Sequence, residues 1–178
     1  LSEPGAGSDV AGTQTRAKAD PGNPGGFILN GTKCWISGGM QADWFVVFAK
    51  VGDPSSRNHG DIRAFIVDGD TPGVSRPRVD AKMGVHGIDT AEIVLENAKV
   101  PAANVIEGSF SLIMQSLNAM RPIVAARGIG LAEGALMYAT EYVKSRPAFE
   151  KTIADFQGIQ WQIAESAAEI EAARLLTY

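Results

Sequence analysis

Trp44-Phe45-Val46-Val47-Phe48-Ala49 is the stretch that decides the fold of the first part of this chain. It is an apolar run of strand length, rich in aromatic and β-branched side chains. Ile62–Val67 and Ala91–Val100 have the same character, and the turn residues Asp68–Gly73 follow the first of them. Short strands separated by turn signals predict an antiparallel β sandwich or barrel-like sheet over residues 1–108.

A hairpin signal lies on the N-terminal side of this run. Asn30-Gly31 is a favoured two-residue hairpin turn, and it stands between the apolar segments Phe27–Leu29 and Lys33–Ile36. The sequence therefore predicts two paired strands joined by a turn at Asn30-Gly31.

The pattern changes near Gly108. Apolar residues recur at helical spacing from Phe110 to about Lys144, and Pro122 inside this segment predicts a kink or a restart of the helix. A second helix is predicted from about Asp155. Its mostly apolar stripe consists of Phe156, Ile159, Ile163, Ala167, Ile170 and Arg174. The expected fold class is α+β by segments, a β domain followed by antiparallel helices.

Composition narrows the classes of protein to which this chain can belong. The 178 residues are 45% hydrophobic and carry a net charge of −4, with no basic stripe of the kind that binds nucleic acid. A single cysteine, Cys34, excludes an internal disulfide and fits a reducing compartment. No apolar run approaches a membrane span, and no signal peptide is visible. Because the chain stops inside a helical pattern at Leu175–Tyr178, we expect a piece of a larger protein.

The first nine residues, Leu1–Asp9 (LSEPGAGSD), form the most informative loop. Gly5 and Gly7 allow positive φ, and Ser8 and Asp9 add a hydroxyl and a carboxylate. Such a loop can point successive backbone N–H groups at a phosphate or pyrophosphate. Taken alone, it could equally be a glycine-rich turn.

Four segments together resemble the acyl-CoA dehydrogenases. Ser2–Asp9 is similar to the family's Thr-Glu-Pro-x-x-Gly-Ser-Asp signature, and Asn30–Ser37 to Asn-Gly-x-Lys-x-Trp-Ile-Thr. Val100–Val105 is similar to Val-Pro-x-x-Asn-Val, and Arg146–Phe149 with Phe156-Gln157 to Arg-x-x-Phe-Gly…Gln. The resemblance covers essentially the whole chain. It implies a middle β domain at residues 1–108 and the first helices of a C-terminal four-helix bundle at 109–178. An N-terminal helical domain and the later bundle helices would be absent.

The resemblance also implies an FAD site. The residues expected to contact the cofactor in the first part of the chain are Leu1, Ser2, Gly7, Ser8, Trp35 and Ser37. Ser2 would hydrogen-bond the flavin ring, Gly7 and Ser8 would meet the pyrophosphate, Trp35 would pack beside the flavin, and Ser37 would lie near its N5. Both serines stand where the family more often has threonine. Serine also carries a hydroxyl, so the hydrogen bonds remain possible.

In the second part of the chain, Arg146, Phe149 and Gln157 match residues that reach FAD held by a neighbouring subunit. The resemblance therefore implies a homodimer or homotetramer with a shared cofactor site. Glu150 stands where the family usually has glycine, which places a carboxylate next to a phosphate-binding arginine. Arg121 matches an arginine near the catalytic centre.

The implied reaction is α,β-dehydrogenation of an acyl-CoA thioester to the 2-enoyl-CoA, with an acceptor of the electron-transfer flavoprotein type. Met120 excludes the variant whose catalytic Glu lies at that position. The usual base would lie beyond Tyr178, so we expect no catalytic base and no turnover in these residues alone. The resemblance implies a role in fatty-acid and lipid metabolism, in the cytoplasm or, in a eukaryote, the mitochondrial matrix.

Other readings of the same residues remain open. The same fold could serve a flavoprotein oxidase, a monooxygenase, or a non-catalytic member that binds acyl-CoA or a partner. Taken singly, Trp35 could be sheet packing, Ser37 a turn residue, and Arg146 a complement to a helix dipole. His59 and His86 lie in polar, glycine-containing loops without partners at metal-ligand spacing, so no metal site is predicted.

Overall fold

A computed structural model of the chain describes residues 1–53, 55–108 and 110–178. The chain divides into two units, Leu1–Ile113 and Met114–Tyr178, each of which is described by itself.

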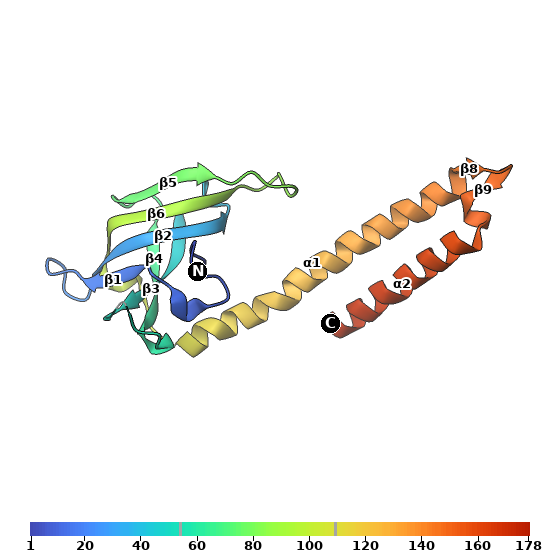
Figure 1. The fold of residues 1–178 in the computed structure, drawn as a ribbon. Helices are drawn as coiled ribbons and strands as arrows, with labels where there is room; N and C mark the ends of the chain where they lie inside the picture. Colours follow the sequence, from blue (N-terminus) through green and yellow to red (C-terminus); the bar gives the residue numbers. More distant parts are fainter. Residues whose placement is uncertain (54, 109) are drawn as a thin grey trace. The chain divides into compact units, whose positions relative to one another are not determined.

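The first unit is built on one seven-stranded sheet with the order β5-β6-β2-β1-β3-β4-β7 (Figure 1). Its strands are β1 (Arg16–Ala19), β2 (Phe27–Ser37), β3 (Trp44–Val51), β4 (Ile62–Asp68), β5 (Val74–Val79), β6 (Thr90–Val100) and β7 (Val105–Ile106). Three short 3-10 helices accompany them, η1 (Val10–Gly12), η2 (His59–Asp61) and η3 (Ala102–Asn104). The predicted antiparallel sheet is confirmed, except that β1 pairs with β3 in parallel.

The predicted hairpin at Asn30-Gly31 is wrong, because β2 continues through both residues. The strand pairs with β6 along its length, from Phe27 opposite Val100 to Ser37 opposite Thr90. Gly31 is needed for another reason. A Cβ built on it would lie 2.7 Å from Thr15 Cα, a separation that real side chains do not adopt. The glycine therefore permits a close approach of two backbones within the sheet.

The core of the first unit is formed by side chains of the sheet's own strands. Leu29, Phe65 and Ile93 are each at most 1% exposed and come from β2, β4 and β6. Full burial of side chains of this size contributes about 1.5–3 kcal/mol each. Phe45 and Val47 of the opening run also belong to this core. The sheet is thus a packed scaffold, and its loops and strand ends remain available for binding.

The second unit contains most of α1 (Phe110–Ser145), a small hairpin of β8 (Pro147–Ala148) and β9 (Lys151–Thr152), η4 (Ile153–Asp155), and α2 (Gln157–Thr177). The two helices run antiparallel, as predicted (Figure 1). Of the predicted kink or restart at Pro122, the restart is wrong, because α1 continues through this residue. Pro122 is exposed, so water can solvate the carbonyl that loses its N–H partner.

Apolar side chains and an ion pair lie between the helices of this unit. Ile159, Ile163 and Ile170 of the predicted stripe line cavities that α1 also borders. At the far end of α2, Arg174 reaches Glu133 of α1 at 2.9 Å. In the part of the chain that the structure describes, no helix is both long and apolar enough to cross a membrane.

Candidate functional site

The loop Leu1–Asp9 is fastened to β2 by its main chain. Cys34 N donates to Ser2 O at 3.0 Å, and Lys33 Nζ donates to Leu1 O at 3.3 Å. Beyond Ser2 the loop turns sharply, since Glu3 and Ala6 exchange backbone hydrogen bonds of 2.9 and 3.1 Å. These contacts place Ser2 beside Cys34, the residue immediately before Trp35.

A buried ion pair reinforces this attachment. Glu3 Oε1 lies 2.7 Å from Lys33 Nζ, and the two residues are 6% and 2% exposed. The Glu3 carboxylate also accepts hydrogen bonds from Gln14 N at 2.6 Å, from Thr15 N at 3.0 Å, and from Thr15 Oγ1. No role for either charged residue was predicted from the sequence. The signal was present, because both belong to the motifs that carry the family resemblance.

The two charges of this pair respond differently to burial. Burial alone would raise the pKa of Glu3, but the Lys33 charge and the hydrogen bonds from Lys33, Thr15 and Gln14 outweigh it and lower the pKa below 4.5. Burial also lowers the pKa of Lys33, against the opposing influence of Glu3. The carboxylate is therefore well stabilised, whereas the ammonium retains part of its desolvation cost. Such a pair contributes little net stability, although breaking it is costly.

Trp35 is exposed by a bulge in β2. Lys33 lies opposite Ile93 and Ile36 opposite Ala91, so β2 has one more residue than β6 in this interval. Trp35 adopts φ of +61°, and the residue is 63% exposed. A bulky residue in the left-handed region is an outlier that the surrounding structure must enforce. The indole therefore does not pack into the sheet of this unit but points outward. Bulges next to binding sites often redirect a side chain in this way.

Ser37 ends β2 and is exposed two residues after Trp35. Neither the Ser2 nor the Ser37 hydroxyl hydrogen-bonds to another residue in the described part of the chain. The exposed indole and the Ser37 hydroxyl belong to β2, and the Ser2 hydroxyl belongs to the loop bound to it. Together they could bind a planar ring that carries hydrogen-bonding atoms. This is the candidate site of the first unit.

The remaining predicted residues of the loop differ in exposure. Leu1 is half-buried and packs against a small cluster formed by Phe48, Ile62 and Ala64. Gly7 and Ser8 are exposed. Gly5 and Gly7 allow positive φ, but neither adopts it. The paired backbone hydrogen bonds between Glu3 and Ala6 already close the turn, so no left-handed glycine is required.

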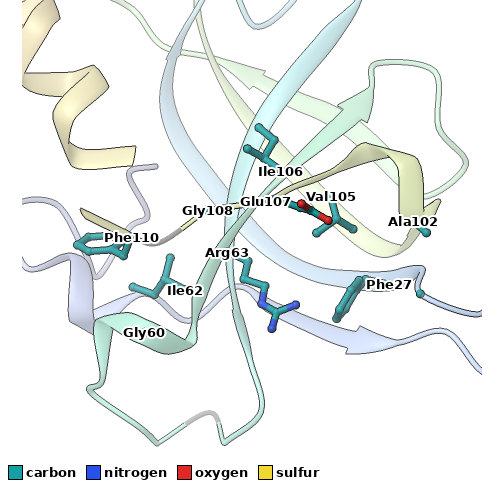
Figure 2. A pocket seen from close by; sticks show the side chains of 11 residues that line it. Phe27, Gly60, Ile62, Arg63, Ala102, Val105, Ile106, Glu107, Gly108 and Phe110 are labelled. Carbon is teal, nitrogen blue, oxygen red and sulfur yellow. The ribbon is translucent and has the colours of Figure 1, made fainter. Parts of the chain in front are cut away.

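A cavity of about 650 Å³ lies elsewhere in the first unit, and none of the predicted site residues lines it. Figure 2 shows Arg63 and Glu107 there, with Phe27 and Phe110 among its apolar walls. Within residues 1–53, 55–108 and 110–178, no group of three or more His, Cys, Asp or Glu side chains could hold a metal ion.

The second unit carries the other predicted cofactor residues. Arg146 follows α1 and is exposed, and its carbonyl accepts a hydrogen bond of 2.9 Å from Ile153 N. Phe149 is 88% exposed at the tip of the β8–β9 hairpin, and Gln157 begins α2 and is exposed. Arg121 is an exposed residue of α1, where its Nη1 donates to Asn118 Oδ1 at 2.8 Å.

The hairpin turn has an unusual backbone. Phe149 and Glu150 have φ of 51° and 66°, so both central residues are left-handed, as in a type I′ turn. Among the described residues, no ion pair joins Glu150 to Arg146, although the sequence places their charges close together. The glutamate therefore affects this turn first through its backbone.

We expect Glu150→Gly to raise the free energy of unfolding by about 1 kcal/mol, because glycine adopts the left-handed region without the steric penalty of a Cβ. Glu150→Ala is the matched control, since it removes the carboxylate but retains the Cβ. Chemical denaturation of the three proteins would measure the difference. A gain in Glu150→Ala equal to that in Glu150→Gly would assign the effect to charge and contradict the backbone argument.

Comparison with protein families places this site in a known context. Residues 1–98 match the acyl-CoA dehydrogenase middle domain, and residues 108–178 match the acyl-CoA dehydrogenase C-terminal domain. The chain belongs to the acyl-CoA dehydrogenase family. The resemblance inferred from the four motifs is thereby confirmed.

Individual acyl-CoA dehydrogenase relatives support the assignment. The chain is 45% identical to an acryloyl-CoA reductase (NADH) of Anaerotignum propionicum, covering 99% of this chain and 45% of that protein. It is 41% identical to the solved butyryl-CoA dehydrogenase of Megasphaera elsdenii, with a TM-score of 0.93, covering 100% of this chain and 46% of that one. A glutaryl-CoA dehydrogenase of Mycobacterium smegmatis, solved in complex with FADH2, is 33% identical with a TM-score of 0.89, covering 99% and 44%. The chain thus spans about half the length of these relatives.

Proposed function

We propose that the protein containing this chain binds FAD and catalyses α,β-dehydrogenation of an acyl-CoA thioester. The observation that carries the proposal is the outward presentation of Trp35 at a strained bulge, between the Ser2 loop and Ser37, in a member of this family. Maintaining a bulky residue at positive φ has an energetic cost, which a ligand stacked on the exposed indole would justify.

The residues of the first unit fit the cofactor. Ser2 and Ser37 supply hydroxyls to the flavin ring, and Trp35 covers it. Leu1, Gly7 and Ser8 lie on the loop that would contact the rest of FAD, including its pyrophosphate. When bound, FAD supplies the chemistry of hydride acceptance. The protein residues orient the ring and exclude water from it.

The second unit supplies a different set of contacts in this proposal. Arg146, Phe149 and Gln157 reach FAD bound by another copy of the chain, so the functional protein is a homodimer or homotetramer. A guanidinium matches phosphate oxygens in geometry and charge, and an exposed phenyl ring can stack on an adenine. Arg121 supports the surroundings of the reacting centre. We assign residues 1–108 to the middle β domain and residues 109–178 to the first helices of the C-terminal bundle.

Removal of the α-proton requires a base, and we place that base outside these 178 residues. Glu133 and Glu141 are engaged in exposed ion pairs with Arg174 and Lys144. An exposed carboxylate that is already paired with a cation is not held free and in place beside a substrate, as a general base must be. The 178 residues alone are therefore expected not to convert substrate.

The proposed function is tested by anaerobic titration of the complete, FAD-loaded protein with short-chain acyl-CoA. We expect bleaching of the flavin absorbance, and we expect Ser37→Ala to slow it by about tenfold or more, the loss of about one hydrogen bond to the reacting ring. Ser75→Ala is the matched control, because Ser75 is exposed on β5 and belongs to no predicted site. Failure of the protein to retain FAD, or equal rates in the two variants, would contradict the proposal.

The reverse reaction is the second candidate, favoured by the 45% identity to the acryloyl-CoA reductase (NADH). Consumption of NADH with a 2-enoyl-CoA, measured on the same protein, separates it from the dehydrogenase. We further propose an acceptor of the electron-transfer flavoprotein type, a role in fatty-acid metabolism, and a location in the cytoplasm or the mitochondrial matrix.

A further inference from the structure

We propose that the buried Glu3–Lys33 pair is a positioning device that fixes the Ser2 hydroxyl against Trp35, so that both residues address the flavin together. The inference rests on the proposed FAD function and deepens it. Glu3 and Lys33 touch no cofactor in this scheme. They act through the loop that they anchor.

The positions of the two charges in the sequence carry the argument. Glu3 directly follows Ser2, and Lys33 directly precedes Cys34, whose N–H binds the Ser2 carbonyl at 3.0 Å. The 2.7 Å ion pair therefore lies one residue away from that backbone hydrogen bond on both segments. Lys33 Nζ also binds Leu1 O at 3.3 Å, on the other side of Ser2. Ser2 is held from both sides by the same ammonium group.

A second anchor fixes the carboxylate itself. Glu3 accepts hydrogen bonds from the backbone of Gln14 and Thr15 at 2.6 and 3.0 Å, just before β1 begins at Arg16. Glu3 thereby joins three separate segments, the loop, the start of β1, and β2. Because each contact is directional, one register of the loop on β2 satisfies them all.

Stability alone does not account for this pair. Two charges almost without exposure pay a large desolvation cost, and apolar side chains of similar volume often replace such a pair without loss of stability. Directional contacts offer what apolar packing lacks, a single defined position of the backbone. A displacement of a hydroxyl by about 1 Å is enough to lose a hydrogen bond to a ligand.

The test is a mutant cycle on FAD affinity in the complete protein, measured by equilibrium dialysis and by the flavin absorbance spectrum. The Glu3→Gln/Lys33→Met double variant removes both charges and leaves neither unpaired. We expect Ser2→Ala and the double variant each to raise the Kd for FAD by about tenfold. We expect the triple variant to be no weaker than the double variant within about twofold, because the misplaced Ser2 hydroxyl no longer contributes.

The outcomes separate this inference from the proposed function. Effects that multiply to about a hundredfold in the triple variant would overturn the positioning role and leave the FAD site intact. No effect of Ser2→Ala on the Kd or the spectrum would remove Ser2 from the flavin site and overturn the inference, whereas failure of the wild type to retain FAD would overturn the proposed function as well. The exposed Asp9–Arg57 pair, at 2.8 Å, supplies the control. The effects of Arg57→Gln and Ser2→Ala on the Kd for FAD should multiply.

Thermal unfolding measures whether each variant is folded under the conditions of the binding experiment. The double variant should unfold at a midpoint close to that of the wild type, which shows that the change in Kd is not a loss of folded protein. If it does not fold, Thr15→Val removes the hydroxyl bond to Glu3 without burying a charge. The same cycle with Thr15→Val should again be less than multiplicative, and a fully multiplicative result would overturn the inference.

Discussion

Replacing Lys33 with methionine alone is expected to lower the free energy of unfolding at pH 7 by about 3–5 kcal/mol, the usual cost of leaving one member of a buried ion pair without its partner. Glu3 is 6% exposed in the wild type, and in the variant the hydrogen bonds from Thr15 and Gln14 would not replace the lost opposite charge. Urea denaturation of the complete protein measures the change. Lys18→Met, at an exposed position of β1, is the matched control and should alter stability by less than about 0.5 kcal/mol.

The pH dependence of this loss provides a stricter check. In the wild type the pKa of Glu3 is lowered below 4.5, so its contribution is complete above that pH and is lost as pH falls through the folded-state pKa. Without Lys33, the burial that raises the pKa of Glu3 loses its main opposing influence, so the pKa of Glu3 should be higher than in the wild type, and the penalty disappears as the carboxyl protonates. The difference between wild type and Lys33→Met should therefore begin to shrink as pH falls through the higher pKa of Glu3 in the variant, and it should continue to shrink as pH falls through the lowered pKa of Glu3 in the wild type. A difference that stays constant with pH would show that lost packing, not charge, is responsible.

Replacing Gly31 with alanine is expected to lower the free energy of unfolding by about 2–3 kcal/mol, the cost of overpacking a site that cannot relax cheaply. The added Cβ would lie 2.7 Å from Thr15 Cα, so a backbone segment must move. Thr15 also donates to Glu3, and the movement should therefore disturb the anchor of the Ser2 loop. Weaker FAD binding should accompany the loss of stability.

Gly87→Ala is the matched control for this substitution, because nothing lies within 4 Å of a Cβ at Gly87 and its φ is not positive. Its midpoint in urea should stay close to that of the wild type. If Gly31→Ala were equally harmless, Thr15 would have room to retreat, and the close approach of the two backbones would not limit the sheet.

Local patterns were enough to predict the elements that carry strong hydrophobic signals. Phe45 and Val47 are buried in β3 as the opening run predicts, and α1 and α2 follow the helical spacing beyond Gly108. Strands with a weak hydrophobic pattern were not predicted from the sequence. β5 contains Pro77 and two arginines, and it is a strand because it pairs with β6 at the edge of the sheet.

Long-range pairing explains the largest error. Asn30-Gly31 has the local preference of a hairpin turn, but β6 supplies hydrogen bonds on both sides of it, and Asn97 N donates to Asn30 Oδ1 at 2.9 Å. The preference of two residues for a turn is easily outweighed by the hydrogen bonds and packing of a whole strand. The same pairing creates the bulge that exposes Trp35, and no pattern in the sequence announces the extra residue.

The sequence by itself determined the order of β and helical segments and the family, because hydrophobic periodicity and motif spacing are local or ordered along the chain. Tertiary structure alone decided that Glu3 meets Lys33, thirty positions further along the chain, in a buried pair. It also decided that Trp35 faces outward at φ of +61° and that Gly31 makes room for Thr15. The reason is physical: burial, strand register and charge pairing depend on which distant segments come together, and a one-dimensional pattern does not contain that information.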